Sequence, residues 1–62
     1  MDIDELLERH LRKMESDAIS TEALSLATGV EQPTVNRRLK SMERYGIVKR
    51  KARRTVDFWG LG

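Results

Sequence analysis

The chain has 62 residues, of which 39% are hydrophobic and 35% are charged. A domain of this length buries only about 60% of its unfolded surface, so it holds one small core and no internal catalytic cavity. The absence of cysteine excludes disulfides and thiolate metal sites, and with one histidine an all-histidine site would need other chains. No apolar run exceeds two residues, whereas a membrane-spanning helix needs about 20. Asp2, Asp4 and Glu5 stand where a secretory signal would be basic and then apolar, so we expect a cytoplasmic protein.

The net charge of +2 conceals an asymmetry between the two halves of the chain. Residues 1–31 carry eight acids against three bases, and residues 32–62 carry nine bases against two acids, Glu43 and Asp57. Such a division indicates that the C-terminal half meets a polyanion while the N-terminal half has another role. The alternative is a basic surface that faces only solvent.

Residues 2–15 are predicted to form an amphipathic helix, because apolar residues recur there at helical spacing. Asp2 or Asp4 can cap this helix and interact favourably with its dipole. His10, in the middle of the apolar face, is expected to be a packed or interface residue rather than a metal ligand. The apolar positions are Ile3, Leu6, Leu7, Leu11 and Met14.

Residues 20–45 are predicted to form two helices joined by a tight turn. Ser20 or Thr21 caps the first helix, which ends at Gly29, where a C-cap favours a residue free to adopt positive φ. The second helix opens at 31–33, because proline is tolerated in a first turn, and runs to Tyr45. A turn of about three or four residues matches helix-turn-helix geometry. The buried stripe of the first helix is expected to be Ala23, Leu24 and Ala27.

The second of these helices has two distinct faces. At about 100° per residue, Val35, Leu39 and Met42 share one face, which is predicted to be core. The opposite face carries three bases and no acid, which favours a functional face over an ordinary solvated one. These bases are Arg37, Lys40 and Arg44.

From Ile47 onward the pattern becomes that of strands. Segments 47–51 and 55–59 are rich in β-branched or aromatic residues, and 52–54 connects them. Five bases fall within the six residues 49–54, so a projecting hairpin would carry charge that can reach phosphates. Phe58 and Trp59 point in opposite directions, so one of them is expected to fill the core. For Trp59, stacking on a base is the alternative to packing.

The predicted fold class is mainly α with a small β-hairpin, in the order of a winged helix-turn-helix. We expect one domain over 1–62, with its first helix at about 2–15, the helix-turn-helix at about 20–45 and the wing at about 47–60. Over about residues 20–60 the chain also resembles the DNA-binding core of bacterial and archaeal regulators of the ArsR and MarR type. The most specific part of this resemblance is Gln32-Pro33-Thr34-Val35, followed by Leu39-Lys40, Met42-Glu43 and Gly46-Ile47-Val48.

This resemblance implies a transcriptional regulator that binds double-stranded DNA, with the helix 31–45 in the major groove and the hairpin on the neighbouring DNA backbone. The residues that it places near bases have side chains suited to guanine or adenine: Gln32, Thr34, Asn36 and Arg37. The residues that it places near phosphates supply affinity without sequence information: Thr21, Arg38, Lys40, Arg44, Lys49, Lys51, Arg53 and Arg54.

The chain departs from these regulators by lacking their further dimerisation helices and sensing sites, so we expect no cofactor, metal or small-molecule ligand. A weaker similarity, carried by Asn36-Arg37-x-Leu39 and Trp59, is to the Zα winged helices that bind left-handed DNA. Lys40 replaces their tyrosine, and Val56-Asp57 replaces their proline pair.

A homodimer is expected, because one recognition helix reads only a few base pairs and two half-sites multiply that selectivity. The interface is predicted on the first helix, at Ile3, Leu7, His10, Leu11 and Met14. No enzyme is expected, since the sequence carries no nucleophile–base set and no glycine-rich phosphate loop. The alternative from another class is a docking module of a replication or transcription complex, whose basic face would bind an acidic protein instead of DNA.

Overall fold

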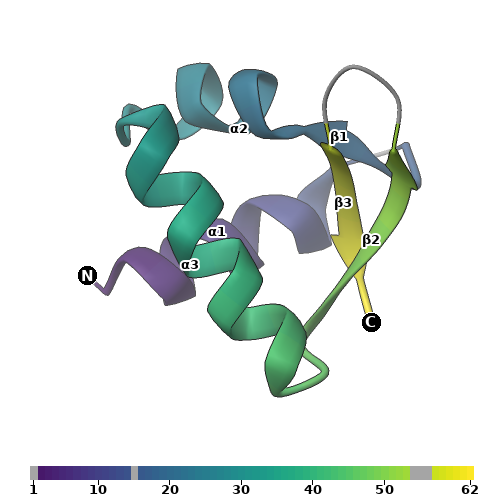
Figure 1. The fold of residues 1–62 in the computed structure, drawn as a ribbon. Helices are drawn as coiled ribbons and strands as arrows, with labels where there is room; N and C mark the ends of the chain where they lie inside the picture. Colours follow the sequence, from purple (N-terminus) through teal and green to yellow (C-terminus); the bar gives the residue numbers. More distant parts are fainter. Residues whose placement is uncertain (1, 15, 54–56) are drawn as a thin grey trace.

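The computed structural model describes residues 2–14, 16–53 and 57–62, with the backbone alone for 52 and 53. Three helices pack against one another and against a small antiparallel sheet whose strand order is β1-β3-β2 (Figure 1). Figure 1 shows α3 and β2 nearest the viewer, with α1 behind them. The elements are α1 (Ile3–Lys13), β1 (Ile19–Ser20), α2 (Thr21–Thr28), α3 (Gln32–Arg44), β2 (Val48–Arg53) and β3 (Asp57–Leu61). This is the predicted winged helix order.

The helix ends follow the capping signals of the sequence. The Asp2 carboxylate accepts a hydrogen bond from the Asp4 amide at 3.4 Å, and the Ser20 hydroxyl accepts one from the Ala23 amide at 3.1 Å. Gly29 adopts φ 75°, a left-handed conformation that costs glycine little. Asp2 and Ser20 are therefore the caps, in preference to Asp4 and Thr21.

The sheet contains a third strand that the hairpin prediction did not include. The short β1 pairs with β3 through Ile19 opposite Trp59 and Ser20 opposite Phe58. The strand β2 begins at Val48 rather than Ile47, because the Ile47 amide donates to the Met42 carbonyl at 3.1 Å and so completes the end of α3. A bulge between Arg50 and Ala52 then shifts the register of β2 against β3.

The core forms where the three helices meet the sheet. Trp59 is fully buried, and its indole Nε1 donates to the Thr21 hydroxyl at 2.8 Å. Packing of Trp59 in the core, rather than stacking on a base, is thus confirmed. The buried apolar residues include the predicted face of α3: Leu7, Leu11, Leu24, Val35, Leu39, Met42, Val48 and Trp59.

Two sequence predictions about buried residues are wrong. In α2 only Leu24 and Thr21 are buried, because the short helix packs through that side and leaves Ala23 and Ala27 exposed. In α1, Leu7 and Leu11 were predicted to lie at a dimer interface, but they are only 0% and 2% exposed. They form the core of a single chain, so their side chains are not available to a dimer interface. Ile3 and Met14 are only partly buried against this core, and His10 is half-buried.

Candidate nucleic-acid interface

The outward face of α3 carries an uninterrupted row of cations. We call Arg37, Lys40 and Arg44 the basic stripe; with Ser41 they line a shallow hollow of about 280 Å³. All four side chains are exposed, and no ion pair among the described residues includes a member of the basic stripe. Three uncompensated cations at helical spacing make a surface that attracts a polyanion.

A second hollow, of about 350 Å³, lies where α3 meets the starts of α2 and β3. It is lined by the amide side chains of Gln32 and Asn36 together with Thr21, Pro33 and Asp57. Amide groups can donate and accept at the same time, which suits them to the edges of bases. The Asp57 carboxylate in the same hollow opposes the approach of a phosphate there.

The four predicted base-reading residues do not form one cluster. Gln32 and Asn36 share the second hollow, whereas Arg37 belongs to the basic stripe. Thr34 is half-buried and, at about 100° per residue, lies on the other flank of α3 from Gln32. The structure thus places Gln32 and Asn36 along one flank of the basic stripe and Thr34, one turn before Arg37, along its other flank.

The Thr21 hydroxyl is occupied inside the protein, so the predicted phosphate contact at Thr21 stays a prediction for the main chain at the start of α2. Thr21 is only 6% exposed, and its hydroxyl accepts the hydrogen bond from Trp59 inside the protein. Arg38 also differs from the basic stripe, because its guanidinium lies 3.7 Å from the Asp4 carboxylate of α1. That acid compensates part of the Arg38 charge.

The bases of the wing are divided between two faces of the sheet. Successive residues of a strand point to opposite faces, so Lys49 and Arg50 diverge. Lys49 and Lys51 are both exposed, and Lys51 lies close against Gly60 and lines a hollow with Asp17 and the end of α1. The predicted phosphate contacts Arg53 (its side chain) and Arg54 lie outside the described residues.

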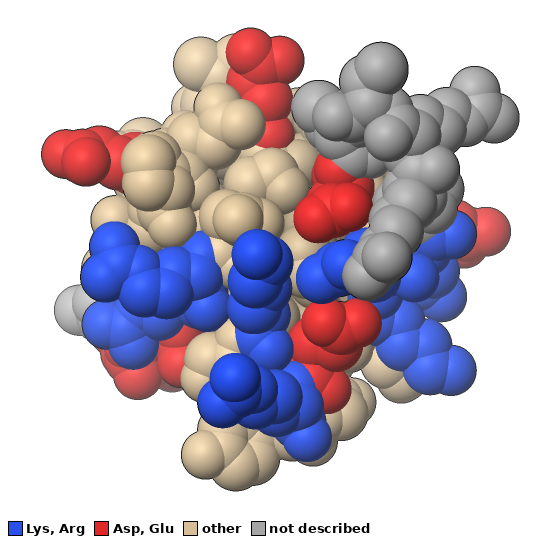
Figure 2. All heavy atoms as spheres, viewed as in Figure 1, with Lys and Arg blue, Asp and Glu red and all other residues tan. Residues whose placement is uncertain are grey.

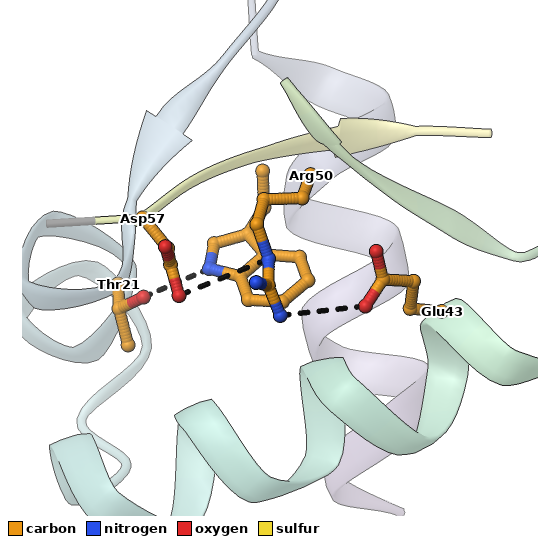
Figure 3. A network of polar contacts seen from close by, with 5 residues as sticks. Thr21, Glu43, Arg50 and Asp57 are labelled. Atoms are coloured by element: carbon orange, nitrogen blue, oxygen red, sulfur yellow. Dashed lines mark hydrogen bonds and ion pairs between the residues drawn. The ribbon is translucent and has the colours of Figure 1, made fainter. Parts of the chain in front are cut away.

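Of the wing bases whose side chains are described, Arg50 is the one that turns toward α3, where it lies between two acids. Its Nη2 lies 3.5 Å from Glu43 Oε1, its Nε lies 3.8 Å from Asp57 Oδ2, and its guanidinium carbon lies 4.9 Å from the centre of the Trp59 ring. Figure 3 shows Arg50 between Glu43 and Asp57, with Thr21 on the same side as Asp57. We call Glu43, Arg50, Asp57 and Trp59 the Arg50 cluster. The space-filling view of this face shows acidic side chains (red) between the basic side chains of α3 and those beside the sheet (both blue; Figure 2).

The Arg50 cluster was not predicted, although the sequence contained a signal for it. Glu43 and Asp57 are the two acids of the basic half of the chain. An acid in a region otherwise rich in bases is expected to pair with a particular base there. Which of the nine bases they hold depends on how β2 and β3 lie against α3, and spacing along the chain does not give that.

Other kinds of site find no support in the part of the chain that is described. There, no three His, Cys, Asp or Glu residues are grouped as metal ligands would be. In that same part, no helix has the length and apolar character needed to cross a membrane.

The order of elements and the exposed basic face of α3 define a winged helix-turn-helix. A family model described as winged helix-turn-helix DNA-binding matches residues 15–49, which is more than half of the chain. The chain therefore belongs to this family of DNA-binding domains, and the predicted fold class and DNA-binding class are confirmed. No curated protein and no solved structure matches the chain.

Proposed function

We propose that this protein is a sequence-specific regulator of transcription that binds double-stranded DNA through α3 and the wing. The observation that carries the proposal is the basic stripe, which is exposed and free of acidic partners among the described residues. It lies on the helix that the family uses for DNA binding. A helix of this diameter fits the major groove.

Within this proposal, the base-reading residues are Gln32, Thr34, Asn36 and Arg37. Arg37 suits the paired acceptors of guanine, and the amides of Gln32 and Asn36 suit adenine. Phosphates are bound by exposed bases, whose charge neutralises a phosphate whatever the DNA sequence is. These bases are Lys40, Arg44, Lys49 and Lys51.

The proposal includes a homodimer on an inverted-repeat site and assigns no catalytic step to the protein. Two recognition helices multiply the selectivity of one, which spans only a few base pairs. With Leu7 and Leu11 in the core, the α1 positions left for an interface are Ile3, His10 and Met14. We also propose a cytoplasmic location, where bacterial and archaeal chromosomes lie.

Selection from a library of random duplexes tests the sequence-specific part of this proposal. We expect the selected pool to converge on one motif arranged as an inverted repeat, and sedimentation of the complex to give two chains per duplex. A pool that binds but remains random after several rounds would contradict sequence-specific recognition. One chain per duplex on a single half-site would contradict the dimer alone.

A further inference from the structure

The two acids of the basic half hold one and the same arginine. Glu43 comes from the last turn of α3, Asp57 from the start of β3, and Arg50 lies between them on β2. The guanidinium also lies over the Trp59 ring, at 4.9 Å from its centre. One side chain therefore joins both strands of the wing to the recognition helix (Figure 3).

Arg50 is poorly placed to bind a phosphate itself. Its side chain is 16% exposed, whereas those of Glu43 and Asp57 are 40% and 28% exposed. A phosphate that approached the guanidinium would meet these two carboxylates first, and their charge opposes it. Arg50 thus differs from Lys49, which is exposed and has no ion pair among the described residues.

The Arg50 cluster also links the wing to α3 by charge. Among the described residues, the ion pair between Arg50 and Glu43 is the one that joins α3 to the wing. On the other side, Trp59 donates to Thr21 of α2. A planar guanidinium presents its donors in a rigid fork and stacks on an aromatic ring, whereas the ammonium group of lysine has neither the fork nor the planar face.

We propose that Arg50 is a positioning residue, which fixes the wing against α3 so that the basic stripe and the exposed wing bases meet one duplex together. Glu43 and Asp57 then support DNA binding although they carry the same sign of charge as DNA. This inference rests on the proposed function, because it concerns how the same surface binds DNA.

The sign of the effect of Glu43→Gln tests the proposal. Removing a surface acid ordinarily strengthens DNA binding, because it removes repulsion from phosphate. Here the loss of the Arg50 partner should lower affinity for the selected site by about threefold or more, the upper part of the range for partly exposed ion pairs. Folding should persist, since a carboxylate near a helix C-terminus opposes the helix dipole.

Glu31→Gln is the control for the loss of an acid, at the N-cap of the same helix. Glu31 precedes α3, makes no side-chain cap hydrogen bond, and has no ion pair among the described residues. Its substitution removes the same charge without touching the Arg50 cluster. We expect affinity for DNA to rise or stay unchanged.

Substitutions of Arg50 separate positioning from phosphate binding. A phosphate contact contributes about 0.9 to the slope of log affinity against log salt. Arg50→Lys keeps the charge but loses the bridge, so it should weaken binding about as much as Arg50→Gln, and the two variants should show the same salt slope. Lys49→Gln, by contrast, should flatten the slope by about 0.9.

Fluorescence anisotropy with the full chain and the selected duplex, over a range of salt, measures all of these values, and thermal melts confirm that each variant is folded. Weaker binding by Glu43→Gln, with the same slope for the two Arg50 variants, supports the proposal. Binding by Glu43→Gln that is as strong as that of the native chain or stronger overturns it, as does a slope that Arg50→Gln flattens and Arg50→Lys retains. A native chain that binds no duplex overturns the proposed function together with this inference, so the two failures are distinguishable.

Discussion

The Thr21 hydroxyl ties together two elements whose residues are 38 positions apart in the sequence. It accepts from the indole of Trp59, the largest fully buried side chain, at 2.8 Å. A buried N–H that loses its acceptor costs more than the hydrogen bond itself contributes, because water does not replace the partner. The side chain of Thr21 consequently has a structural role in the DNA-binding domain.

Thr21→Val should destabilise the protein by about 1–3 kcal/mol, because it leaves the Trp59 N–H unpaired while preserving the shape of the side chain. Chemical denaturation monitored by Trp59 fluorescence measures this. Thr28→Val makes the same change in the same helix, where the Thr28 hydroxyl donates to the Leu24 carbonyl and is half-buried. It should cost about 0.5 kcal/mol or less. Equal losses from the two variants would contradict the role given to Thr21.

Arg37→Ala should relax sequence preference. The forked contact of arginine with guanine contributes about 1–3 kcal/mol of discrimination, so binding to the selected site should fall by that amount. Lys40→Ala, one turn along the basic stripe, should weaken the selected and random duplexes alike. Competition between the two duplexes measures the difference, and equal losses on both for Arg37→Ala would remove it from the base-reading set.

The turn between α2 and α3 sets the angle at which the recognition helix leaves the body of the domain. Gly29 at φ 75° ends α2, and its amide donates to the Ser25 carbonyl at 2.9 Å. The Ser25 hydroxyl in turn donates to the Val30 carbonyl at 2.5 Å. These two contacts close the turn, and the glycine conformation is what allows the chain to reverse there.

Gly29→Ala should therefore destabilise the domain by about 1–2 kcal/mol, the cost of a left-handed conformation for a residue with a Cβ. Space is not the reason, since an added Cβ at this position meets nothing within 4 Å. Gly29→Asn should cost less, because asparagine tolerates this conformation better than alanine. Thermal unfolding of the two variants checks the order, and a loss for asparagine that exceeds the loss for alanine would be inconsistent with it.

At the scale of the whole molecule, sequence periodicity predicted what depends on neighbours along the chain. The three helices, the Gly29 turn and the buried face of α3 follow from spacing and capping, and the structure confirms them. What the sequence did not reveal depends on contacts between distant segments. The pairing of β1 with β3 is one example.

The candidate site divides in the same way. Arg37 and Lys40 share an exposed face because helical spacing alone puts them there. The roles of Thr21 and Arg50 depend instead on where Trp59 and two acids lie in space. Leu7 and Leu11 show the limit for α1, since an apolar stripe does not reveal whether the core of one chain or a partner covers it.

The most direct test of whether the basic stripe of α3 binds DNA is to measure binding to a random 30-base-pair duplex by fluorescence anisotropy at several salt concentrations. For the native chain we expect a log–log slope of about −4 or steeper. A triple variant with glutamine at positions 37, 40 and 44 should flatten this slope by about 2, which corresponds to the phosphate contacts of Lys40 and Arg44. The absence of binding at low salt, or a slope that the triple variant leaves unchanged, would contradict the account.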